Sequence, residues 1–205
     1  MKPILGIAVI LGAAALIAFL VLKSNRSKGT ARTGIARPNV SSRLREKLFS
    51  TNPRELGLAP SKQLPNVWGV VMEIGFPDFT ATMFSLAEGT TSLYLSSGGG
   101  VIGGGQHEAV RRRASEFLFA AERALPLFRP TTTFPLAGPG MVRFYILAYS
   151  GIYFAEAPES LVTTSGHPLF PLFSAGHDVM TELRLIDQEM RPKGDVRRLP
   201  GDDEL

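Results

Sequence analysis

The sequence has no cysteine, three histidines and one tryptophan among its 205 residues. Without cysteine the chain has no disulfides, which agrees with a reducing compartment, and no thiolate ligands for a structural zinc site. It also lacks the HExxH motif of zinc proteases, the GxSxG motif of α/β-hydrolases and the GxxxxGKS/T motif of P-loop nucleotidases. We therefore predict no catalytic residue, no metal and no cofactor, and a binding role is favoured over an enzymatic one.

Charge is missing from a long stretch near the N-terminus. Residues 4–22 read ILGIAVILGAAALIAFLVL, without a single charged side chain. At about 1.5 Å per residue, a helix of this length comes close to the roughly 30 Å hydrocarbon core of a bilayer. The run is longer than the apolar core of about 7 to 15 residues in a cleaved signal peptide. We therefore predict that residues 1–22 form a retained transmembrane anchor in a lipid bilayer.

Basic residues follow this apolar run and outnumber the single Lys2 before it. The four closest to the span are Lys23, Arg26, Lys28 and Arg32. Because Lys and Arg gather on the cytoplasmic side of single spans, this asymmetry predicts a cytoplasmic domain on a single-pass membrane protein of bacterial type. The sequons at Asn25 and Asn39 and the final Asp-Asp-Glu-Leu leave the lumen of the endoplasmic reticulum as an alternative.

The net charge of +4 comes from a basic strip and not from the rest of the chain. Residues 23–47 hold eight Lys or Arg and one acid, so the sequence from residue 48 onward is mildly acidic. Such a strip suits anionic lipid headgroups. No aromatic residues alternate with the basic ones to stack bases, so nucleic acid is not an expected partner. We interpret residues 23–64 as a juxtamembrane tether with short helical turns, the first around Leu44, Leu48 and Phe49 and the second at Asn52-Pro53.

Periodicity predicts one α+β domain over residues 65–190, followed by a disordered polar tail over 191–205. The expected strands are 68–76, 79–87, 91–97, 141–149 and 152–157, and the expected helices are 106–125 and 171–190. The order βββ-α-ββ-α indicates an antiparallel sheet with the helices packed on a face. Profilin-like and roadblock-type interaction domains place two strands before the central helix and three after it, so this order assigns no family.

A glycine-rich stretch lies between the third strand and the first long helix. Gly98, Gly100 and Gly103 match a GxGxxG pattern, which together with Arg111 and Arg112 makes a weak candidate anion site. A dinucleotide-binding fold also needs a parallel strand after the helix, whereas here a Pro/Gly-rich crossover follows. We therefore interpret the glycines as a sharp loop that lets the helix pack close to the sheet. A membrane-tethered nucleotide or phosphate sensor, or an enzyme using residues 98–105, is the alternative.

Two sets of side chains are candidates for protein contacts. Tyr145, Tyr149 and Tyr153 are expected on an outer sheet face that another protein covers. The run from Arg111 to Arg113 is a candidate patch for an acidic partner or a lipid headgroup, or a solvated face paired with Glu108 and Glu116. These features predict a membrane-anchored accessory or scaffolding subunit that binds other proteins of a respiratory, photosynthetic, secretory or transport complex.

Overall fold

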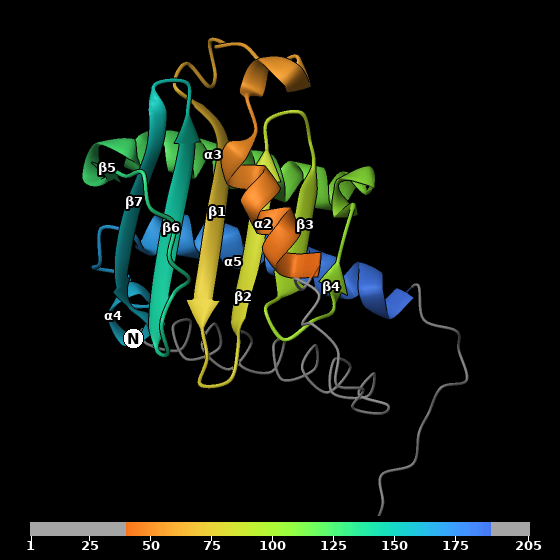
Figure 1. Cartoon of the computed structure of the whole chain (residues 1–205), viewed down its shortest axis with the longest axis vertical. Helices are drawn as coiled ribbons and strands as arrows, with labels where there is room; N and C mark the ends of the chain where they lie inside the picture. The colour runs from red at the N-terminus through yellow and green to blue at the C-terminus, as the bar shows by residue number, and fades with distance from the viewer. Residues whose placement is uncertain (1–39, 190–205) are drawn as a thin grey trace, which may run out of the picture.

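The computed structural model describes residues 40–189, which form three layers. Figure 1 shows helix α2 (Val40–Ser50) in front of a central antiparallel sheet, with α3 (Glu108–Ala124) and α5 (Phe170–Glu189) behind it. The predicted anchor, the basic residues from Lys23 to Arg32 and the tail 190–205 lie outside the described residues. Within residues 40–189, no helix has the length and apolar character needed to cross a bilayer.

The sheet confirms the predicted α+β class and antiparallel pairing. Its strands are β1 (Val67–Gly75), β2 (Thr80–Leu86), β3 (Thr91–Leu95), β4 (Gly100–Val101), β5 (Arg129–Pro130), β6 (Met141–Ala148) and β7 (Gly151–Pro158). Their spatial order is β4-β3-β2-β1-β6-β7-β5, and every neighbouring pair is antiparallel. The five long strands match the predicted ones, and the two-residue strands β4 and β5 add the edges.

The central strand β1 is buried on both faces. Successive side chains of β1 point to opposite faces of the sheet. Val70, Met72 and Ile74 point toward α3 and α5, while Val71 and Glu73 face the opposite side. We call the side under α3 and α5 the inner face and the side under α2 the outer face. Because both faces are covered, all nine residues of β1 are buried.

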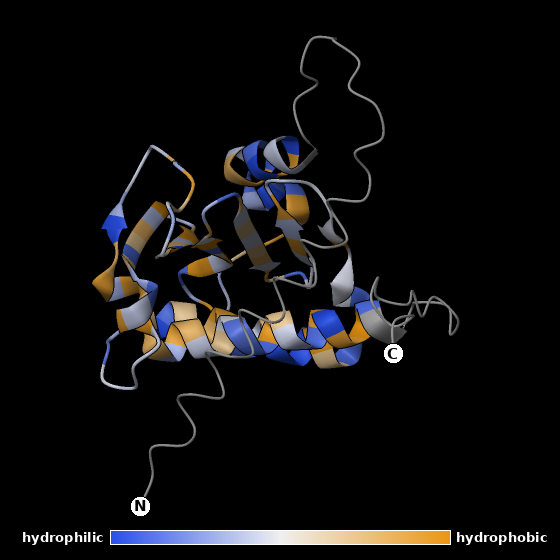
Figure 2. Cartoon of the chain, turned by 90° about the horizontal axis from the view of Figure 1, so that it is seen from below, coloured by the Kyte–Doolittle hydropathy of each residue, from blue (hydrophilic) through white to orange (hydrophobic). Residues whose placement is uncertain are grey.

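The inner face is covered by the two long helices that the sequence predicts. The stripe of α5 consists of Phe173, His177, Met180, Leu183 and Ile186, and all five are buried. The corresponding buried positions of α3 are Val110, Ala114, Phe117 and Ala121. Gly176 allows α5 to approach the sheet, since a Cβ there would lie 2.9 Å from the sulfur of Met72. The inner core is therefore built from these two stripes and the inward side of the sheet (Figure 2).

The outer face is covered by α2 and by a segment of the crossover between η4 (Leu125–Leu127) and β6. Helix α2 is followed by the single turn η2 (Pro53–Leu56), whose first free amide, on Arg54, donates to the side chain of Asn52 at 3.1 Å. The sequence predicts short helices in this segment, and the structure has α2 and η2 there. Helix α2 packs on the sheet through Leu48, with Leu44 and Phe49 partly buried beside it, although the sequence predicts this helix within the tether. The outer cluster beneath them consists of Leu48, Trp68, Val71, Phe84, Leu86, Tyr94, Tyr145 and Leu147.

Candidate functional site

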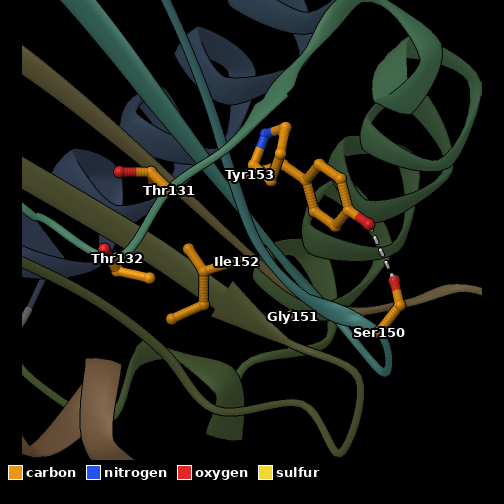
Figure 3. Close-up of a pocket in the computed structure, with 7 residues that line it drawn as sticks. Thr131, Thr132, Ser150, Gly151, Ile152 and Tyr153 are labelled. Atoms are coloured by element: carbon orange, nitrogen blue, oxygen red, sulfur yellow. Dashed lines mark hydrogen bonds between the residues drawn. The ribbon is translucent and has the colours of Figure 1, made fainter.

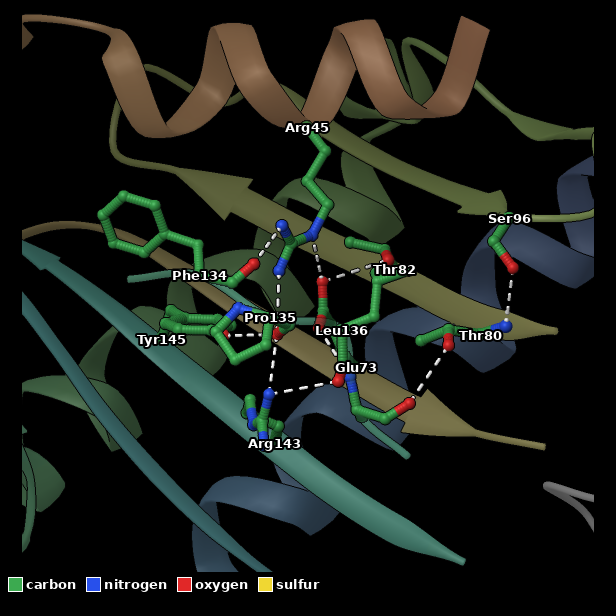
Figure 4. Close-up of polar contacts among 11 residues, drawn as sticks. Arg45, Glu73, Thr80, Thr82, Ser96, Phe134, Pro135, Leu136, Arg143 and Tyr145 are labelled. Atoms are coloured by element: carbon green, nitrogen blue, oxygen red, sulfur yellow. Dashed lines mark hydrogen bonds and ion pairs between the residues drawn. The ribbon is translucent and has the colours of Figure 1, made fainter. Parts of the chain in front are cut away.

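A buried carboxylate marks the centre of the outer face. Glu73, in the middle of β1, has no exposed surface. Its Oε1 accepts from Arg45 Nε at 2.6 Å and from Thr82 Oγ1 at 3.3 Å, and its Oε2 accepts from the backbone N–H of Ala137 at 3.2 Å (Figure 4). The three donors come from α2, β2 and the crossover. Glu73 therefore joins three segments that are far apart in the sequence.

Arg45 is the side chain by which α2 reaches this carboxylate. Besides Glu73, its guanidinium donates to the carbonyl of Phe134 at 2.6 Å and to that of Pro135 at 3.2 Å. The guanidinium carbon also lies 4.8 Å from the ring centre of Phe49 and 5.7 Å from that of Tyr145. The Arg45 side chain is only 14% exposed, so its charge is satisfied by chain atoms rather than by water.

The crossover segment 134–137 supplies backbone groups to the same site. The Tyr145 hydroxyl donates to the Pro135 carbonyl at 2.6 Å, and Arg143 Nη1 donates to the same carbonyl at 2.7 Å. The ring of Phe134 stacks on that of Phe49, with centroids 4.4 Å apart and planes inclined by 2°. A segment without long regular structure is thereby fixed between α2 and β6. We call Arg45, Glu73 and residues 134–137 the outer-face lock.

Burial keeps the phenols around the lock protonated. Desolvation, followed by the negative charge of Glu73, raises the pKa of Tyr145 and of Tyr94. The Tyr94 hydroxyl is buried without a hydrogen-bond partner among the described residues. Both oxygens of Glu73 are already engaged by donors of the chain. This arrangement suits holding segments together, and it offers a reactant neither a free carboxylate nor a phenolate.

The glycine-rich stretch folds as a tight structural connection. Gly100 has a φ of +144° and pairs with Tyr94 as part of β4, where a Cβ would lie 2.2 Å from a backbone oxygen. The N–H of Gly103 donates to Ser92 Oγ at 3.2 Å. Gly98 also has a positive φ, in the turn that leads into β4. Gly98, Gly100 and Gly103 thus allow the backbone conformations that this loop needs. The Gly103 amide, one of those proposed to bind an anion, already donates to Ser92.

The three consecutive arginines of α3 have different surroundings. Arg113 bridges the two inner helices, with Nη1 lying 2.9 Å from Glu116 and 3.6 Å from Asp178 of α5. Arg111 is exposed and pairs with Glu108 at 3.4 Å. Arg112 is exposed and makes no ion pair within residues 40–189. The run therefore leaves Arg111 and Arg112 on the surface of α3, while Arg113 joins α3 to α5.

The three candidate interface tyrosines do not share one surface. Tyr145 is 1% exposed and lies beneath the aromatic pair of α2 and the crossover, so the chain itself covers it. Tyr149 packs partly against the outer cluster, whereas Tyr153 packs partly against the inner core. Figure 3 shows Tyr153 at an open hollow of about 320 Å³, where its hydroxyl lies 3.1 Å from Ser150 Oγ. No charged side chain lines that hollow.

Histidines and carboxylates do not gather into a metal site within residues 40–189. His177 lies in the inner core at 9% exposure, and its Nε2 is buried without a hydrogen-bond partner among the described residues. Desolvation lowers the pKa of its imidazole, so the ring is neutral at pH 7.

The lock was not among the sites that the sequence predicts. Its one local signal is Glu73, the only charged residue in the apolar strand VWGVVMEIG. A charge at a doubly buried position requires a cation, but Arg45 lies 28 residues away in a segment that reads as tether. No family model, curated protein or solved structure matches this chain.

Proposed function

We propose that this chain is a membrane-anchored accessory or scaffolding subunit that binds other proteins of a membrane complex. The observation that carries the proposal is the outer-face lock. It holds α2, which lies within the predicted tether of residues 23–64, on the sheet through the Arg45–Glu73 pair. Moving α2 away from the sheet would leave Glu73 without its cation, and removing one member of a buried ion pair typically costs about 3 to 5 kcal/mol.

The layer order supports a division of roles between the two faces. Helix α2, which is part of the predicted tether, lies on the outer face, and α3 and α5 form the opposite surface of the domain (Figure 2). In this proposal the outer face is turned toward the bilayer, and the surface of α3 is left for partner proteins. Arg111 and Arg112 are exposed there, and only Arg111 has an acidic neighbour that pairs with it. An acidic surface on the partner is the complementary chemistry.

Purification of the full chain from native membranes tests the proposal. We expect partner proteins to co-purify with the wild type, and the Arg111→Glu/Arg112→Glu variant to recover several-fold less of them. The control is Arg54→Glu/Lys62→Glu, which reverses two exposed charges in the segment before β1 and should leave recovery unchanged. Equal recovery with both variants, or the absence of any stoichiometric partner, would contradict the proposal.

The alternative of a nucleotide or phosphate sensor makes a different prediction. A ligand present at 100 times its dissociation constant should raise the free energy of unfolding by about 2.7 kcal/mol. Against this alternative, Gly103 donates its amide to Ser92 and Gly100 belongs to the β3–β4 ladder. We therefore expect no shift in the melting temperature with nucleotides or inorganic phosphate.

A further inference from the structure

A second hollow, of about 470 Å³, lies where the sheet meets the start of α5. Its lining includes Leu127, Arg129, Phe154, Glu156, His167 and Leu169. Leu127 is 52% exposed there. The hollow thus offers uncovered apolar area next to charged groups.

The hollow borders a part of β7 that pairs with β6 on one edge but extends beyond the end of β5 on the other. The ladder between β7 and β5 contains only two residue pairs, Phe154 with Arg129 and Tyr153 with Pro130. One further hydrogen bond follows it, from the Thr131 N–H to the Ile152 carbonyl at 2.8 Å. The backbone N–H and C=O groups of successive residues in a strand point to opposite edges, so every second residue faces the same edge. Glu156 therefore turns its N–H and C=O to the same side as Ile152, beyond the end of β5. An extended segment can add to β7 at this point.

The charges around the hollow favour an acidic occupant. Arg129 is exposed and has no hydrogen-bond or ion-pair partner within residues 40–189. His167 accepts the Leu169 N–H on Nδ1 at 3.2 Å, so a neutral ring carries its proton on Nε2 and can donate to a carboxylate. The one acid in the lining, Glu156, is engaged by Arg143 Nε at 3.0 Å. The uncompensated charge of the hollow is therefore positive.

We propose that residues 202–205, Asp-Asp-Glu-Leu, dock into this hollow within the same chain. Their three carboxylates complement Arg129 and His167, and Leu205 complements the apolar side chains beside them. The reach is sufficient: α5 begins next to the hollow and is 20 residues long, so its end lies about 30 Å away. The 16 residues from 190 to 205 span up to about 53 Å when extended. A segment of this length can therefore reach the hollow and the edge of β7.

Engineered disulfides test this docking in the full chain, because the native sequence contains no cysteine. One variant combines Leu205→Cys with Leu127→Cys in the hollow. The comparison variant combines Leu205→Cys with Ile102→Cys. Ile102 is 66% exposed and lies two residues before Gly104, where an added Cβ would contact Leu183 of α5. Residue 102 is thus nearer the end of α5, and a segment without a docking site would reach it more readily.

We expect the 127–205 disulfide to form about fivefold faster than the 102–205 disulfide at low salt, the ratio that roughly two exposed ion pairs would produce. Arg129→Gln, or the combined Asp202→Asn/Asp203→Asn/Glu204→Gln change, should remove this preference, and high salt should do the same. Arg112→Gln, a change at another exposed and unpaired arginine, should leave it intact.

Three results would overturn the proposal. The 102–205 disulfide would form as fast as the 127–205 disulfide, the charge changes would leave the ratio unaltered, or the 127–205 product would run as a covalent dimer.

Discussion

At the scale of single residues, the outer-face lock depends on one carboxylate that water does not reach. A buried charge is stable only with a cation and hydrogen-bond donors close by. Glu73 obtains its cation from Arg45, and its donors from Thr82 and the Ala137 amide. The resulting contacts decide where α2 and the crossover lie.

Replacing Arg45 with Met should destabilise the fold by about 3 kcal/mol, because the carboxylate of Glu73 would remain buried without its cation. Urea unfolding of the full chain in detergent measures this loss. Trp68, the single tryptophan, is 3% exposed in the outer cluster and reports the transition by its fluorescence. The double variant Arg45→Met/Glu73→Gln, which removes both charges, should recover most of the loss. A single Arg45→Met variant as stable as the wild type would disprove the role of the pair.

Replacing tyrosine with phenylalanine at two buried positions should change the free energy of unfolding in opposite directions. Tyr94→Phe removes a hydroxyl that has no partner and should raise the free energy of unfolding by about 1 kcal/mol. Tyr145→Phe removes the hydrogen bond to the Pro135 carbonyl and should lower it by about 1 kcal/mol. Melting temperatures of the two variants compare these effects directly. Changes of equal sign would show that the two hydroxyls have similar surroundings.

Alkaline pH should weaken the fold through the same phenols. Burial raises the pKa of Tyr94 and of Tyr145 above the ordinary value of 10.0. Below that value both states keep the proton and stability is unaffected, but above it the unfolded chain loses the proton first. The free energy of unfolding should therefore fall as the pH rises beyond about 10. The decline measured in urea should be shallower for Tyr94→Phe, and an equal decline would refute the assignment to Tyr94.

At the scale of secondary-structure elements, the glycine stretch works as a connection between the sheet and α3. A Cβ on Gly105 would lie 1.9 Å from the carbonyl oxygen of Gly89, a backbone atom that cannot move aside easily. We expect Gly105→Ala to destabilise the fold by about 2 kcal/mol. Gly166→Ala is the control, since its Cβ would meet nothing within 4 Å. Thermal unfolding measures both, and a silent Gly105→Ala would mean that this loop is free to relax.

The strands and helices that show a regular spacing of apolar residues could be predicted from the sequence. The alternation from Trp68 onward, the turn at Gly89 and the stripe from Phe173 to Ile186 each report local geometry, and the strands and helices follow them closely. The docking of α2 and of residues 134–137 could not be predicted in the same way. It depends on contacts across 28 and 64 residues that converge on Glu73, and no local period records such contacts. An isolated acid in an apolar strand is the signal that points to them.

At the scale of the whole molecule, the proposed role rests on how the layers are joined to the predicted anchor. The lock attaches α2 to the outer face, and α3 on the inner face carries the exposed Arg111 and Arg112. A single domain of this kind can hold a partner at a set position relative to the bilayer. Its purpose then depends on residues 4–22 remaining in the mature protein and in the membrane.

Alkaline carbonate washing of native membranes, followed by mapping of the N-terminal peptide, tests this central claim most directly. We predict that the full chain stays in the washed membrane pellet with residues 4–22 intact, and that a variant lacking residues 1–22 is released. Recovery of the native protein in the aqueous wash, beginning downstream of Leu22, would contradict the membrane-anchored role.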